Sequence, residues 1–111
     1  MLKYWLHQRA AAEFDAIFAW YAARDPEVAA GFAELVERAI GDVCRRPLAH
    51  PMWPKIAPGL GVRRCVMDRF PYTIPFIVEG DTVIIVAFAH HRRRPGYWIR
   101  RVRTPRATPR K

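Results

Sequence analysis

The sequence contains no serine, and this absence removes a large class of chemistry. Acyl transfer through a serine nucleophile is excluded. The sequence also has no glycine-rich phosphate loop, no GxSxG elbow and no HExxH or Cys/His metal array. We therefore predict a protein that uses neither a cofactor nor a metal.

Long apolar runs and paired cysteines are missing too. No apolar stretch approaches the roughly 20 residues of a membrane span, and the first residues lack the apolar segment and cleavage site of a signal peptide. Cys44 and Cys65 form no CxxC pair, so buried thiols are expected rather than a disulfide or a zinc site. These features indicate a cytoplasmic protein with no membrane contact.

Acidic residues are absent from the C-terminal part of the chain. Residues 1–89 carry ten Lys or Arg and ten Asp or Glu, whereas residues 90–111 carry nine Lys or Arg and no acid, so this segment supplies the whole net charge of +9. A neutral body with a cationic end indicates an acidic partner. For residues 100–111 alone, a solvated tail is an equally good interpretation.

Apolar residues recur with helical spacing in the first half of the chain. An aromatic-rich strand is expected over residues 2–6, followed by an amphipathic helix over residues 8–23. Asp25 followed by Pro26 predicts the start of a second helix, since aspartate caps a helix and proline suits its first position. Pro47 ends this helix. Because so few residues separate them, the helices should form an antiparallel hairpin.

The second half of the chain has the pattern of a β-meander. A loop with four prolines precedes three strands, which are expected over residues 61–68, 72–79 and 82–89. Pro75 lies inside the middle strand and cannot donate to a ladder, so a bulge or an unpaired position is expected there.

These elements predict an α+β fold with the order β-α-α-β-β-β. The helical hairpin should pack on one face of a small, mainly antiparallel sheet. The predicted domain spans residues 1–98, and the basic tail over residues 99–111 is expected to be disordered.

The last predicted strand ends in a cationic and aromatic cluster. His90 and His91 point to opposite faces if the strand continues, so they suit a structural hydrogen bond better than a shared metal. Arginines beside Tyr97 could stabilise the charge of a phosphodiester under attack and stack on a base. They could equally bind a phosphate backbone or an acidic protein. Composition does not separate these alternatives.

Three sequence pieces resemble the RelE/ParE superfamily of bacterial toxins. They are GVRR in residues 61–64, RFPY in residues 69–72 and the ending AHHRRRPGYW in residues 89–98. The resemblance covers residues 2–98. It implies the β-α-α-β-β-β fold, a cognate antitoxin as partner, and contact with DNA only through the antitoxin complex.

Members of this superfamily have two activities. RelE-like toxins cleave mRNA on the ribosome, and ParE-like toxins poison DNA gyrase without catalysis. The arginine that the RelE-like pattern has after the conserved tyrosine is Thr73 here, and one of two basic positions on the preceding strand is Val66. We therefore expect a ParE-like inhibitor of gyrase or another replication target. The alternative is a metal-independent ribonuclease that uses Arg64, Arg92, Arg93 and Tyr97.

The resemblance and the residue pattern together predict two binding surfaces. The predicted target-binding surface consists of Arg63, Arg64, Arg69, His91, Arg92, Arg93, Arg94, Tyr97 and Trp98. The predicted antitoxin-binding groove consists of Phe14, Phe18, Tyr21, Phe32, Leu35 and Trp53.

Overall fold

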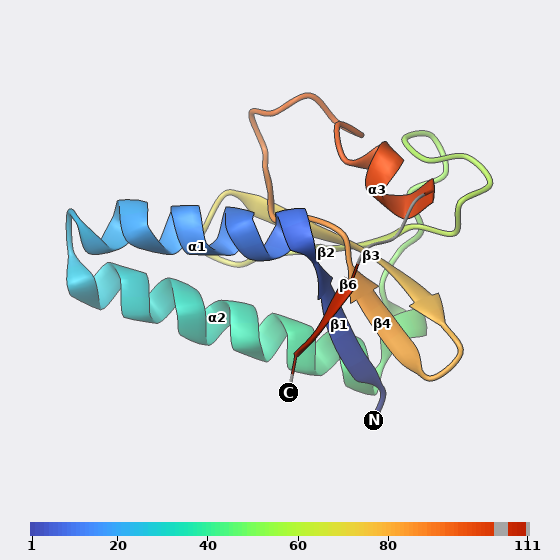
Figure 1. Ribbon diagram of the computed structural model, residues 1–111, viewed down its shortest axis with the longest axis horizontal. Helices are drawn as coiled ribbons and strands as arrows, with labels where there is room; N and C mark the ends of the chain where they lie inside the picture. Colours follow the sequence, from blue (N-terminus) through green and yellow to red (C-terminus); the bar gives the residue numbers. More distant parts are fainter. Residues whose placement is uncertain (104–106, 111) are drawn as a thin grey trace.

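A helical hairpin lies on one face of a twisted sheet in this computed structural model, which describes residues 1–103 and 107–110. Helices α1 (Gln8–Ala22) and α2 (Pro26–Arg45) run side by side in opposite directions (Figure 1). Asp25 caps α2 as predicted, because its carboxylate accepts a hydrogen bond of 3.0 Å from the backbone N–H of Glu27. Neither these helices nor any other described helix is long and apolar enough to cross a membrane.

The sheet is mixed, and its strands have the order β2-β3-β4-β1-β6. β1 pairs in parallel with β4, and every other pairing is antiparallel. The α+β fold predicted from the sequence is confirmed, with a short 3₁₀ helix added at Pro47–Ala49. The strands are β1 (Lys3–His7), β2 (Arg63–Val66), β3 (Tyr72–Glu79), β4 (Thr82–Ile85), β5 (Ala89–His90) and β6 (Ala107–Arg110).

A bulge interrupts the strand predicted over residues 82–89. The register on either side leaves residues 86–88 facing only two residues of β3, Ile74 and Pro75. The nitrogen of Pro75 cannot donate to the ladder, but its carbonyl oxygen accepts a hydrogen bond of 2.9 Å from the N–H of Val86. The single predicted strand is therefore two strands, β4 and β5.

Side chains cover both faces of the sheet. On the helical side, Phe32 and Phe76 are wholly buried, together with the free thiols Cys44 and Cys65. Burial raises the pKa of Cys65 to about 11, so this thiol is protonated at neutral pH.

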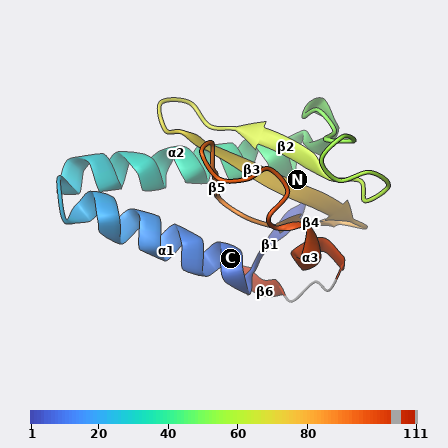
Figure 2. The ribbon, with the colours of Figure 1, turned by 90° about the horizontal axis from the view of Figure 1, so that it is seen from above.

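The opposite face of the sheet carries a second core. Trp98 is wholly buried there, and its ring lies 5.5 Å from the ring of Trp53, which belongs to the proline-rich loop. Figure 2 shows the hairpin on one side of the sheet and α3 (Ile99–Arg103) on the other. The chain's own loop and C-terminal segment therefore occupy the face that the hairpin leaves open.

The C-terminal segment differs from the predicted disordered tail. Ile99 and Val102 of α3 pack against the second core, and β6 pairs with β1. A free strand edge and an apolar surface give these residues partners that the composition of the tail does not reveal. The rest of the predicted tail, residues 104–106 and 111, lies outside the described residues.

The turn at Gly96 provides a test of this second core. Gly96 has φ +82°, and a Cβ placed there would lie 2.9 Å from Cδ1 of Ile99 and 3.1 Å from Cγ2 of Ile56. Gly96→Ala should lower the free energy of unfolding by about 2 to 3 kcal/mol, through backbone strain and overpacking together.

Gly59→Ala is the matched control for Gly96→Ala. Gly59 has φ +75°, but a Cβ placed on it would meet no atom within 4 Å. This variant should lose only about 1 kcal/mol, from the backbone alone. Urea denaturation of both variants measures the difference, and equal losses would contradict the packing of Gly96 against Ile99.

Candidate functional site

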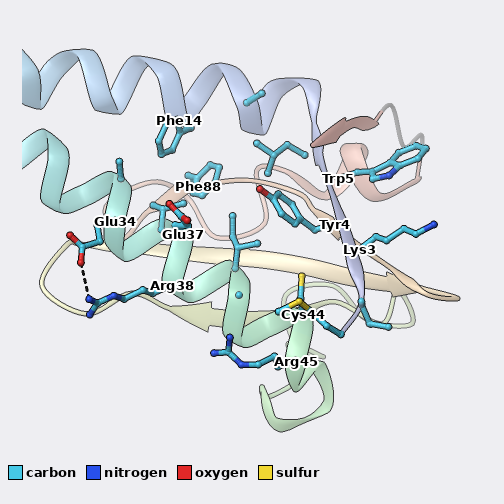
Figure 3. A pocket seen from close by; sticks show the side chains of 18 of the residues that line it. Lys3, Tyr4, Trp5, Phe14, Glu34, Glu37, Arg38, Cys44, Arg45 and Phe88 are labelled. Atoms are coloured by element: carbon cyan, nitrogen blue, oxygen red, sulfur yellow. Dashed lines mark hydrogen bonds and ion pairs between the residues drawn. The ribbon is translucent and has the colours of Figure 1, made fainter. Parts of the chain in front are cut away.

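A large groove opens between the helical hairpin and β1. Its volume is about 1450 Å³. Figure 3 shows Tyr4, Phe14 and Phe88 between the two helices and β1, with charged side chains along α2. On this rim, Arg38 donates a hydrogen bond of 2.8 Å to Glu34. An apolar floor with a charged rim suits the binding of an amphipathic helix.

The groove is not formed by the six residues predicted from the sequence. Only Phe14 of that set lines it. Phe32 is wholly buried in the core, and Trp53 lies in the second core across the sheet. Phe18, Tyr21 and Leu35 are elsewhere on the hairpin. The contribution of β1 leaves no signal in the sequence, since only the parallel pairing of β1 with β4 brings Leu2, Tyr4 and Leu6 to the groove.

A partly buried carboxylate on α1 holds the C-terminal segment in place. Glu13, whose side chain is 15% exposed, accepts hydrogen bonds from the N–H of Phe88 at 3.0 Å and the hydroxyl of Tyr97 at 2.8 Å. Arg101 donates two more, both of 3.0 Å, and Arg93 forms an ion pair at 3.5 Å. One carboxylate thus satisfies donors from three separate parts of the chain.

The Glu13 network sets the chemical state of Tyr97. Burial, and next the hydrogen bond to Glu13, raise the pKa of the phenol above its usual range. The guanidinium carbon of Arg93 lies 3.6 Å from the centre of the Tyr97 ring. Tyr97 is therefore a protonated donor at neutral pH, and the charge of Arg93 is already partly neutralised.

The four residues of the alternative ribonuclease site do not all meet. Arg93 and Tyr97 are in contact. Arg64 instead lies 5.7 Å from the ring of Trp53, and the backbone N–H of Arg92 donates to Nδ1 of His90 at 3.0 Å. The structure thus brings together one cation and the phenol, and both are engaged by Glu13.

Both histidines of the strand end make hydrogen bonds, as expected for at least one of them. Nε2 of His91 lies 3.0 Å from the hydroxyl oxygen of Thr73, and Nδ1 of His90 accepts from Arg92. Within residues 1–103 and 107–110, no group of three or more His, Cys, Asp or Glu side chains is arranged to hold a metal.

The other members of the predicted target-binding set do not form one surface. Trp98 is wholly buried and offers no surface to a partner, while Arg63 donates a hydrogen bond of 2.7 Å to the carbonyl of His50. Arg69 and His91 are exposed on neighbouring turns, which are joined by a hydrogen bond of 2.9 Å from the N–H of His91 to the carbonyl of Pro71. The end of the sheet near these turns therefore carries the accessible part of the set.

Replacing Glu13 by glutamine should destabilise the protein strongly. Glu13→Gln leaves the guanidinium of Arg101, whose side chain is 11% exposed, without its anionic partner. We expect the free energy of unfolding to fall by about 3 kcal/mol. Asp15→Asn, an exposed position two residues along α1, should change it by less than about 0.5 kcal/mol. Similar losses for the two variants in urea denaturation would show that the network contributes little.

Acid should destabilise the protein through His7. This residue is 7% exposed, and its Nδ1 accepts a hydrogen bond of 3.1 Å from the N–H of Arg9 at the start of α1. Burial, then Arg101 and Arg9, lower the pKa of His7 from its usual 6.5, and Glu13 opposes them. Because the unfolded chain takes up a proton that the folded protein resists, the free energy of unfolding should decline as the pH falls below about 6.5.

His7→Asn tests this pH dependence while keeping a capping side chain. The variant should show a flatter decline in the free energy of unfolding between about pH 6.5 and 5 than the original protein. Chemical denaturation at several pH values gives both curves. Parallel curves would mean that His7 does not cause the decline.

Comparison with known proteins identifies the family. The sequence model described as "ParE toxin of type II toxin-antitoxin system, parDE" matches residues 4–95. A solved structure described as the chromosomal ParDE toxin–antitoxin system from P. aeruginosa superposes with a TM-score of 0.69 and 25% sequence identity, over 81% of this chain and 96% of that chain. A comparison with curated proteins found no match. The chain belongs to the ParE toxin family of type II toxin–antitoxin systems.

Proposed function

We propose that this protein is a growth-inhibiting toxin that binds DNA gyrase, or another replication target, in the cytoplasm and is neutralised by a cognate antitoxin. The observation that carries the antitoxin part of the proposal is the groove between the hairpin and β1. Part of its apolar lining, at Leu2, Tyr4 and Phe14, is exposed to solvent in the isolated protein, and an apolar patch rimmed by polar residues is typical of a partner-binding site.

The proposed occupant of the groove is an amphipathic helix of the antitoxin. Its apolar side should contact Leu2, Tyr4 and Phe14, the partly exposed apolar residues of the lining. Acidic residues along its edge should meet Arg38 and Arg45 on the rim. Any contact of the toxin with DNA is proposed to occur only through the antitoxin complex.

The Glu13 network favours binding over RNA cleavage as the mode of action. Electrostatic stabilisation of phosphoryl transfer needs cations that are preorganised and directed at the reacting phosphate. Arg93 and Tyr97 are instead directed at Glu13, and Thr73 stands where the ribonuclease pattern has an arginine. This arrangement supports a non-catalytic toxin.

A gyrase assay tests the proposed target. Purified protein should inhibit DNA supercoiling by gyrase and increase cleaved DNA, and the neighbouring gene's product should reverse both effects. If gyrase is unaffected, cleavage of mRNA on translating ribosomes is the next measurement. Specific cuts there would establish the ribonuclease alternative and overturn the proposal.

A glycine on α2 allows the groove to be tested without unfolding the protein. Gly41 lines the groove, so Gly41→Gln places a side chain in it and also improves helix propensity by about 0.5 kcal/mol. We expect antitoxin affinity to fall by about tenfold or more, as for loss of an interface hot spot, with stability unchanged or improved.

The matched control for the groove is Gly31→Gln on the same helix. Gly31 lies outside the groove lining, and a Cβ there would meet no atom within 4 Å. This variant should bind the antitoxin as tightly as the original protein in a calorimetric titration. Equal affinities for the Gly41 and Gly31 variants would argue that the antitoxin binds elsewhere.

A further inference from the structure

A second, smaller pocket lies along the C-terminal half of α1, beyond the part of the helix that lines the groove. Its volume is about 350 Å³. It shares no residue with the groove, and none of its lining residues belongs to the Glu13 network. Its lining comes from the C-terminal half of α1 and from the ends of β3 and β5, and consists of Ala16, Ile17, Trp20, Tyr21, Tyr72 and His90.

The walls of this pocket are rigid aromatic rings that meet edge to face. The rings of Trp20 and Tyr21 are 5.2 Å apart at 88°, and those of Tyr72 and His90 are 5.1 Å apart at 88°. Burial and the neighbouring Tyr21 hydroxyl raise the pKa of Tyr72 to about 12, so this phenol stays neutral at physiological pH. The pocket is thus an open, mostly apolar depression with aromatic side chains that already contact one another, which limits the freedom they lose when it is filled.

Trp20 has the environment of a binding hot spot. It is 54% exposed, an unusual state for so large an apolar side chain. The guanidinium of Arg24 lies 3.6 Å from the centre of the Trp20 ring and donates a hydrogen bond of 2.8 Å to the backbone carbonyl of Trp20. Tryptophan, tyrosine and arginine are the residues most enriched at positions that contribute most of the binding energy of protein interfaces.

Cations from three segments surround the pocket. The Arg24 side chain stacks on Trp20 of the lining. Arg92 and Arg69 lie in segments beside the pocket, because the backbone N–H of Arg92 donates to His90 and the ring of Phe70, next to Arg69, contacts Tyr21. In the part of the chain that the structure describes, no carboxylate pairs with Arg24, Arg69 or Arg92. The pocket therefore combines an apolar depression with Arg24 on its wall and two further unpaired arginines in the neighbouring segments.

We propose that this pocket, lined by Trp20, Tyr72 and His90, is a docking site for an acidic protein segment that inserts one large apolar side chain. The three arginines would meet carboxylates on either side of the inserted residue. The proposal concerns a contact outside the antitoxin groove, and it does not depend on gyrase being the target.

Two other occupants fit the pocket less well. A second copy of the chain would bring together two bodies of net charge +9, which repel each other. A nucleic acid base needs an open ring face for stacking. Here Arg24 already covers one face of Trp20, and the other rings meet edge to face.

Binding of short peptides tests the docking site directly. The probe is a peptide of about twelve residues with one central tryptophan flanked by glutamates, titrated into the full chain and followed by ¹⁵N chemical shifts. We expect the largest shifts at Trp20, Tyr72 and His90. Replacing the peptide's tryptophan by alanine, or its glutamates by lysines, should weaken binding by about tenfold or more.

Variants of the protein locate the site. Trp20→Ala removes an exposed side chain and should weaken binding of the acidic tryptophan peptide by about tenfold. Phe18→Ala removes another aromatic residue of α1, 37% exposed and outside the pocket lining, and should change binding less than about twofold. Antitoxin affinity should be the same for both variants, which separates this site from the groove.

Three results would overturn the proposal. The first is equal affinity for the tryptophan and alanine peptides, which would mean attraction by charge alone. The second is a set of chemical shifts confined to the groove residues. The third is tighter binding of a short oligothymidylate than of the peptide at the same residues, which would make a nucleic acid the occupant.

Discussion

The Glu13 carboxylate is the contact on which the arrangement of the C-terminal segment depends. A buried charge is costly unless several donors surround it, so its partners must be positioned together. The bulge at residues 86–88 takes the N–H of Phe88 out of the ladder and makes it available to Glu13. A proline in β3 thus permits the bulge, the bulge supplies a donor, and the completed network holds Tyr97 and Arg101 against α1.

Fixing the C-terminal segment in this way closes the second face of the sheet. Trp98 follows Tyr97 directly and fills the second core beside Trp53. With both sheet faces covered, the two hollowed surfaces described here lie along α1. Phe14 belongs to the groove near β1, and Trp20 belongs to the pocket near β5. The two linings are made by different residues of α1.

The local elements were predictable because their signals are local. The cap at Asp25 and the apolar stripe of α1 each act within a few residues, and both helices lie where predicted. The groove was not predictable, because it requires the parallel pairing of β1 with β4 across most of the chain. The role of Glu13 could have been inferred from its position in the sequence. Glu13 occupies the apolar stripe of α1, three residues after buried Ala10, and a carboxylate in such a stripe needs a buried partner.

The same carboxylate bears on whether Tyr97 and Arg93 are available for RNA cleavage or for protein binding. Cleaving RNA with Tyr97 and Arg93 would require both to leave Glu13, exposing a partly buried anion that still faces Arg101. Binding an acidic protein requires a smaller rearrangement of the Glu13 network. Arg93 is half-exposed and can turn from Glu13 to a partner's carboxylate, exchanging one ion pair for another while Tyr97 and Arg101 hold the network together. The geometry therefore opposes catalysis at this position far more strongly than it opposes binding.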